Sequence, residues 1–261
     1  MDTFSLKPLD LPVQKLHLRL KPTLNYLYRR PPLTPVRFIL FGRGRSGTTA
    51  LVSLLDAVAG IQCDGEILRR PVLLPQAYLH SCCAKSSAYA YGCKILSYHI
   101  RDVQPLLRRQ RFLSQLDRAG FKIIYLQRRN LLHHAISNLT ARVSGFYQKK
   151  TDGVNKHRKI VVDPEAVLDW IRRSERLAAY EQTLLKGLTV LPLTYEDNIR
   201  HSHQHQATVD AICEFLAVPS SPVTSAYRKQ TSGRWQDGIL NHQELAQVIA
   251  NTPYAQYLQE D

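Results

Sequence analysis

A glycine-rich stretch at residues 42–49 carries the residue types that bind phosphate groups. An apolar run precedes it, and an apolar, helix-compatible run follows it. Strand, glycine-rich turn and helix is the arrangement that aims backbone N–H groups and a helix N-terminus at an anion. The loop that binds nucleoside triphosphates reads G-x-x-x-x-G-K-[ST]. Gly42 and Gly47 have this spacing, but Thr48 stands in the lysine position and the cation comes earlier, at Arg45.

A second segment has the residue types of a phosphate contact. Arg129 and Ser137 lie eight residues apart, across the junction between an apolar strand at 121–127 and a helix. A guanidinium at the strand end and a hydroxyl two turns along the helix can converge on one phosphate. Alone, the pair reads as a surface arginine and an ordinary helix serine. No acidic residue ends the strand, and a kinase or ATPase needs one there to hold its metal.

Together the two segments resemble the sulfotransferases that use 3′-phosphoadenosine-5′-phosphosulfate (PAPS). The first loop of that family reads approximately [KR]-[ST]-G-[ST]-[ST], and its second motif is R-x7-S, which Arg129 through Ser137 match. The likeness spans about residues 36 to 258. It implies an α/β fold like that of P-loop nucleoside-triphosphate hydrolases, with a central parallel β-sheet flanked by helices. It also implies PAPS as co-substrate, no metal, and transfer of a sulfuryl group to an acceptor hydroxyl.

The resemblance implies a role for each matched segment. Backbone N–H groups of the first loop hold the 5′-phosphosulfate, and Arg45 stabilises charge as the bond to the sulfuryl group breaks. The second motif binds the 3′-phosphate. A tyrosine after a late strand lies near the adenine, and a basic segment near the C-terminus folds over the donor. The expected donor-binding residues are Arg45, Ser46, Gly47, Thr48, Thr49, Arg129, Ser137, Tyr195, Arg228 and Lys229.

Two residues compete for the role of general base. Bacterial carbohydrate sulfotransferases that act on nodulation factors and trehalose carry Gly-Glu after the second strand. This sequence has Glu66 there, following a short strand that is expected beside the phosphate-binding loop at residues 42–49. The other interpretation of Glu66 is a solvated turn carboxylate. Eukaryotic cytosolic members use a histidine beside a lysine, in K-T-H. That motif is missing here, but Lys94 and His99 follow the third strand, so His99 is the alternative base.

The acceptor is expected to be a small molecule with a hydroxyl group. The Gly-Glu likeness favours a carbohydrate or glycolipid, and a hydroxylated secondary metabolite stays open. The formal charge of +14 fits a polyanionic ligand, but also nucleic acid or an anionic membrane surface. No nucleic-acid-binding signature accompanies it, so no such partner is expected. A non-catalytic nucleotide- or nucleic-acid-binding P-loop protein is the alternative function, and a salt titration would distinguish it.

Composition indicates a cytoplasmic protein. No stretch approaches the ~20 apolar residues that span a bilayer, and the N-terminus has no apolar signal core. Five cysteines, odd in number and without a C-x-x-C pair, fit free thiols in a reducing compartment, and structural zinc is not expected.

Alternating elements must position these residues. Strands that alternate with helices predict a parallel sheet covered on both faces, with ligands at the carboxyl ends of its strands. Asp163 and Pro164 have the positions of an N-cap and a first helical residue. Residues 1–35 are expected to form an N-terminal arm on a sulfotransferase domain at 36–261, and a homodimer is left open. The expected strands are 36–41, 60–66, 92–99, 121–127 and 188–197, and the helices are 50–58, 101–120, 130–147, 163–187 and 206–218.

Overall fold

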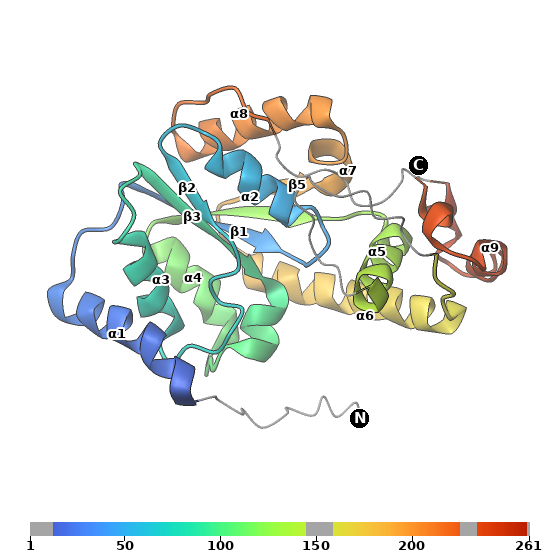
Figure 1. Ribbon diagram of the computed structural model, residues 1–261, viewed down its shortest axis with the longest axis horizontal. Helices are drawn as coiled ribbons and strands as arrows, with labels where there is room; N and C mark the ends of the chain where they lie inside the picture. Colours follow the sequence, from blue (N-terminus) through green and yellow to red (C-terminus); the bar gives the residue numbers. More distant parts are fainter. Residues whose placement is uncertain (1–12, 145–158, 225–233, 260–261) are drawn as a thin grey trace.

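The computed structural model describes residues 13–144, 159–224 and 234–259. At its centre is a five-stranded parallel sheet in the order β2-β3-β1-β4-β5 (Figure 1). The α/β fold class and the parallel sheet predicted from the sequence are confirmed. The strands are β1 (Val36–Gly42), β2 (Ile61–Asp64), β3 (Ala90–Leu96), β4 (Phe121–Gln127) and β5 (Val190–Thr194).

Helices cover both faces of the sheet (Figure 1). Phe38 and Leu40 point from β1 to the face covered by α2 and α8, while Ile39 and Phe41 point to the face covered by α3, α4 and the end of α6. All four side chains are fully buried, as expected for the central strand of a parallel sheet. The helices are α1 (Val13–Arg29), α2 (Thr48–Asp56), α3 (Pro75–Cys83), α4 (Phe112–Arg118), α5 (Leu131–Ser144), α6 (Pro164–Leu185), α7 (Tyr195–Asn198), α8 (His205–Leu216) and α9 (His242–Ala250).

Two local predictions concern helix ends. The side chain of Asp163 accepts a hydrogen bond from Glu165 N at 3.0 Å, so the predicted N-cap of α6 is confirmed. In the N-terminal region, α1 ends at Arg29, before the prolines that follow it. This helix packs on α3, where the Tyr26 hydroxyl lies 3.4 Å from His80 Nδ1.

The helix predicted over residues 101–120 is wrong in its first half. Only the α4 segment is α-helical, and a π-helical turn and a 3₁₀ turn precede it. Pro105 is the cause, because its ring disfavours helical backbone at Gln104, which is extended with ψ 139°. Gly120, with φ 81°, follows α4 in the left-handed region, as the sequence suggested.

The register of the central strands places three loops at one edge. Gly42, the last residue of β1, is the partner of Leu96 on β3 and of Leu126 on β4. The chain segments after β1, β3 and β4 therefore begin side by side at the carboxyl edge of the sheet. A Cβ at Gly42 would collide with the carbonyl oxygen of Leu126, so this close approach of β1 and β4 requires glycine. The predicted phosphate-binding loop at residues 42–49 thus begins at the edge of the sheet where ligands bind in open α/β folds.

Replacing Gly92 by alanine should destabilise the sheet, because a Cβ there would collide with the Phe38 ring. We expect the free energy of unfolding to fall by about 1–3 kcal/mol, the range for overpacking a core. Urea denaturation followed by circular dichroism measures it. Gly238→Ala is the matched control, since nothing lies within 4 Å of its added Cβ. Equal stability of the two variants would contradict the described packing of β1 on β3.

Candidate functional site

The loop after β1 has the backbone of an anion site. Arg45 and Gly47 have φ values of 66° and 87°, and Ser46 Oγ donates to the carbonyl of Arg43 at 2.6 Å. Helix α2 begins at Thr48, its N-cap Gly47 supplies no side-chain acceptor, and its first turn has no acidic residue. The N–H groups at a helix start need acceptors, and the helix dipole favours negative charge there. The loop can therefore receive an anion.

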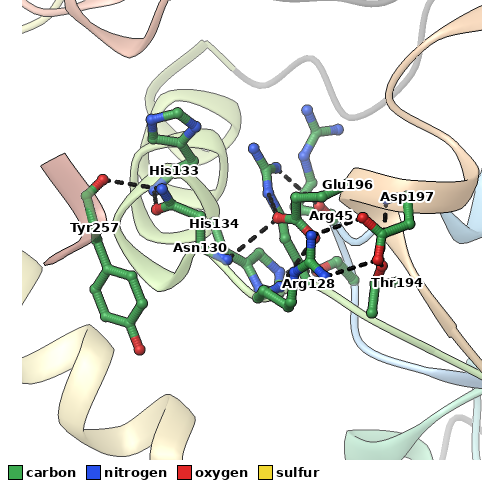
Figure 2. A network of polar contacts seen from close by, with 11 residues as sticks. Arg45, Arg128, Asn130, His133, His134, Thr194, Glu196, Asp197 and Tyr257 are labelled. Carbon is green, nitrogen blue, oxygen red and sulfur yellow. Dashed lines mark hydrogen bonds and ion pairs between the residues drawn. The ribbon is translucent and has the colours of Figure 1, made fainter. Parts of the chain in front are cut away.

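The structure brings the two sequence-predicted phosphate segments together. Arg45 Nε donates to Ser137 Oγ at 3.2 Å, although the two residues are 92 positions apart. On the same side, Arg128 Nη1 donates to the Arg45 carbonyl at 3.4 Å. Figure 2 shows Arg45 and Arg128 close together near the start of α5. The sequence interpretation joined Ser137 to Arg129 instead, so the contact between loop and helix is a finding of the structure.

Arg129 is held from α7. Its guanidinium donates to both carboxylate oxygens of Asp197 at 2.7 Å, and about half of each side chain is exposed. Thr194 Oγ1 also donates to Asp197, at 2.8 Å. The Thr194 hydroxyl is the main cause of the lowered pKa of Asp197, with Arg129 adding to it. The backbone N–H of Arg129 donates to Glu196 Oε2 at 3.1 Å, so two carboxylates of α7 fix the start of the second motif.

Arg128 is a site residue that the sequence interpretation missed. Its guanidinium lies 4.5 Å from the centroid of the Tyr195 ring, and its Nε is 3.9 Å from Glu196 Oε1. Burial lowers the pKa of Arg128, while Tyr195 and Glu196 oppose that shift. The Tyr195 ring also packs against Gly47, where an added Cβ would lie 2.7 Å from it. The signal in the sequence was the pair of consecutive arginines after β4, of which only the second was used.

His134 fixes the loop from the other side. Its Nε2 lies 2.7 Å from the carbonyl oxygen of Gly44, and its ring packs edge-on against Trp170. Burial holds the pKa of His134 well below its usual value, and the charges of Arg128 and Arg43 act in the same direction. A neutral imidazole has one N–H, which we assign to Nε2 because a carbonyl can only accept.

A buried ion pair anchors the loop to α6. Arg43 Nε lies 3.2 Å from Glu181 Oε2, and both side chains are almost fully buried. Arg43 also donates to Ser174 Oγ at 2.7 Å, and the Tyr125 hydroxyl donates to Glu181 at 2.7 Å. Removing one partner of such a pair leaves a buried charge uncompensated. No pattern in the sequence indicated this pair, since Glu181 lies in a long helix rich in charged residues.

The candidate base lies in a cluster that reaches the loop through a lysine. Lys94 Nζ lies 2.9 Å from Glu66 Oε1 and donates to Thr49 Oγ1 at 3.0 Å. The strand that precedes Glu66 was expected beside the phosphate loop, but β3 lies between β2 and β1. Lys94 belongs to β3 and spans this gap. It therefore connects the candidate base to the start of α2.

Glu66 and His99, the two competing bases, face each other. His99 Nε2 lies 3.4 Å from Glu66 Oε2, and the Tyr98 hydroxyl donates to the same oxygen at 3.4 Å. His99 is fully buried, and its Nδ1 accepts from the backbone N–H of Leu96, whereas 23% of the Glu66 side chain is exposed. Burial raises the pKa of Glu66, but the contacts with His99 and Lys94 outweigh it and lower the value to about 2. Glu66 is thus ionised and the more accessible of the two.

Other features bear on cofactors. Among residues 13–144, 159–224 and 234–259, no group of three or more His, Cys, Asp or Glu side chains is placed to hold a metal ion. All five cysteines are free thiols. In the same part of the chain, no helix combines the length and apolar character needed to cross a membrane. Arg228 and Lys229, expected to close over the donor, lie outside the described residues.

Comparisons with known proteins support the fold. No protein-family model matches the chain, and no curated protein matches its sequence. A sulfotransferase from Alicyclobacillus acidocaldarius has a similar structure, with a TM-score of 0.50 at 16% identity, covering 86% of this chain and 94% of that one. Mouse sulfotransferase SULT7A1, solved with PAP, gives a TM-score of 0.46 at 16% identity, covering 93% and 94%. The likeness to the first of these structures shows that the chain has a sulfotransferase-like α/β fold.

The lowered pKa of Glu66 predicts a pH-dependent contribution to stability. A carboxyl group whose pKa falls on folding stabilises the fold above its unfolded value of 4.5, and this is lost as the pH drops toward 2. The difference in unfolding free energy between the native protein and Glu66→Gln should shrink from about pH 6 to about pH 3 in urea denaturation. When both proteins also carry Lys94→Met, this difference should change less with pH, because Lys94 no longer lowers the pKa of Glu66. An unchanged pH dependence in that background would show that Lys94 does not lower the pKa.

Proposed function

We propose that this protein is a PAPS-dependent sulfotransferase that transfers the sulfuryl group to a hydroxyl of a small acceptor, a carbohydrate or glycolipid. The observation that carries the proposal is the hydrogen bond from Arg45 to Ser137, because it joins the loop proposed to hold the 5′-phosphate and the motif proposed to hold the 3′-phosphate. The sulfotransferase-like fold supports it. A nucleoside-triphosphate enzyme fits less well, because Thr48 replaces the loop lysine and Gln127, not an acid, ends β4.

The donor would be held by the loop and by the second motif. Backbone N–H groups of residues 46–49 and the start of α2 would bind the 5′-phosphosulfate. Arg45 and Lys94 bring positive charge to the two sides of this loop, through their contacts with Ser137 and Thr49. Ser137 and Arg129 would bind the 3′-phosphate. Tyr195 packs beside the loop, and Arg228 and Lys229 stay candidates for the covering segment.

The residues of the acceptor side would then assist the transfer. Glu66 would take the proton of the acceptor hydroxyl while its oxygen forms a bond to sulfur and the bond from sulfur to the phosphate oxygen breaks, releasing PAP. Arg45 and Lys94 would stabilise the charge that develops on the leaving phosphate. His99, which is buried against Glu66, would orient the carboxylate rather than touch the acceptor.

Lys94 also bears on the strength of the base. A carboxylate with a pKa of about 2 is ionised at neutral pH but accepts a proton weakly. Its low pKa depends partly on Lys94, which also donates to Thr49 in the loop. An anion bound at the loop would attract the same ammonium group and so raise the basicity of Glu66.

Binding of PAP should raise the melting temperature without added Mg²⁺, while ATP with Mg²⁺ should do so weakly. The reason is the pair of phosphate segments without an acidic metal ligand at the end of β4. Differential scanning fluorimetry with both nucleotides at equal concentrations measures the effect. Equal stabilisation by ATP with Mg²⁺ would favour a nucleoside-triphosphate enzyme instead.

Substitutions in the second motif should separate the two phosphates. Ser137→Ala and Arg129→Ala should each weaken PAP binding by about 1.5–3 kcal/mol, the range for a lost hydrogen bond to a charged group. Binding of adenosine-5′-phosphosulfate, which has no 3′-phosphate, should barely change. Isothermal titration calorimetry measures both ligands, with Arg172→Ala, an exposed arginine of α6, as control. If both ligands weaken equally, these residues serve the fold and not the 3′-phosphate.

A third test identifies the base. Glu66→Gln should lower kcat at least ~100-fold, because a positioned base contributes roughly 10²–10⁴-fold, with PAP affinity nearly unchanged. His99→Ala should reduce kcat less, since His99 orients Glu66 and is itself fully buried. Rates are measured with PAPS and an acceptor found by mass spectrometry. Near-normal turnover of Glu66→Gln with an inactive His99→Ala would make His99 the base.

A further inference from the structure

Two exposed loops lead away from the acceptor-side cluster. Residues 65–74 contain Glu66 and lead from β2 to the start of α3, and residues 104–111 follow the turn that contains His99. Leu68 of the first loop is fully buried, but each loop also exposes leucine side chains. The exposed fractions are 58% for Leu73, 42% for Leu74 and 104% for Leu107.

A buried glutamine holds these loops side by side. Gln104 is 3% exposed and begins the second loop. Its Nε2 donates to the carbonyl oxygens of Leu68 and Arg70 at 2.7 and 2.8 Å, and its Oε1 accepts from Val72 N at 3.1 Å. Three hydrogen bonds from one side chain therefore fix the second loop to the first. The two loops form a single surface, which we name the leucine–arginine surface.

This surface is basic. The two segments contain five arginines, and their one acidic residue, Glu66, is paired with Lys94. Arg69 is close enough to the cluster to oppose the rise in the pKa of Tyr98. Four of the five arginines are exposed, which are Arg69, Arg70, Arg108 and Arg111.

We propose that the leucine–arginine surface binds an anionic lipid bilayer. Arginines beside an anionic leaflet gain electrostatic attraction, and leucines between them can enter the boundary of the acyl chains. A single exposed leucine is ordinary, whereas here three lie on two joined loops among exposed arginines, which is a combination that suits a membrane surface. Nucleic acid would use the arginines and leave the leucines in water, so a bilayer fits better.

Bilayer binding does not depend on the chemistry of the site, but it bears on the identity of the acceptor. Both loops begin at the candidate acceptor side, so a bilayer bound there would present its headgroups toward Glu66. The inference that the acceptor is a hydroxyl of a membrane lipid rests on the proposed sulfotransferase function. Binding to the bilayer itself does not.

Co-sedimentation of the full chain with vesicles tests the proposal. We expect binding to vesicles of equal parts phosphatidylglycerol and phosphatidylcholine, and at least about tenfold weaker binding to phosphatidylcholine alone. The double variant Leu73→Glu/Leu107→Glu should bind the anionic vesicles at least about tenfold less. Arg69→Gln/Arg108→Gln should lose roughly fivefold per arginine at low salt. This second variant alters exposed side chains only, and it keeps the test decisive if the glutamates impair folding.

Matched controls locate the effect. Leu240→Glu, 58% exposed beside α9, and Leu24→Glu, 52% exposed on α1, should bind vesicles like the native protein. The proposal is overturned if both loop variants keep native binding, if only Leu24→Glu loses it, or if neutral vesicles bind equally. A single-stranded oligonucleotide that displaces the vesicles is a further readout. If it binds the native protein and Leu73→Glu/Leu107→Glu equally well, the surface would be assigned to nucleic acid. The rise in melting temperature that PAP causes should be the same in these variants as in the native protein. If PAP does not stabilise the native protein, the proposed function is contradicted, but the proposal of bilayer binding is not.

Discussion

Buried positive charge is the constraint on which the candidate site depends. Arg43, Lys94 and Arg128 all place cationic groups in largely buried positions around one loop. Removing such groups from water is costly unless each gains a partner. The partners come from three different elements, which are Glu181 on α6, Glu66 after β2, and Glu196 with Tyr195 on α7. The loop can keep its shape only when these elements are in place.

This arrangement is also suited to a negatively charged ligand. The carboxylates of Glu181, Glu66 and Glu196 compensate the buried cations. The start of α2 offers backbone N–H groups, because its N-cap Gly47 supplies no side chain to accept their hydrogen bonds. Arg45 adds a guanidinium that faces Ser137 on the second motif. Preorganised donors of this kind can bind a negative group at little cost in reorganisation, because the fold already holds them in position.

Local patterns in the sequence predicted the parts of the structure that depend on neighbouring residues. The apolar run before Gly42 and the Asp163-Pro164 pair led to the right strand and the right helix start. Pro105 broke the expected helix, and the strand order, which no local pattern encodes, placed β3 between Glu66 and the loop. Contacts between distant segments were missed for the same reason. The Arg45–Ser137 hydrogen bond spans 92 positions and depends on how β1 and β4 pair.

The contact between His134 and Gly44 has a consequence for acid conditions. The unfolded chain takes up a proton on this histidine near its ordinary pKa of 6.5, whereas the folded loop resists protonation because the ring is buried among arginines. Stability from this group is complete above that pH and declines as the pH falls below it. Protonated imidazole beside Arg43 and Arg128 would add a third positive charge to a crowded region. Acid therefore destabilises the loop after β1 through His134, a group that takes no part in the proposed chemistry.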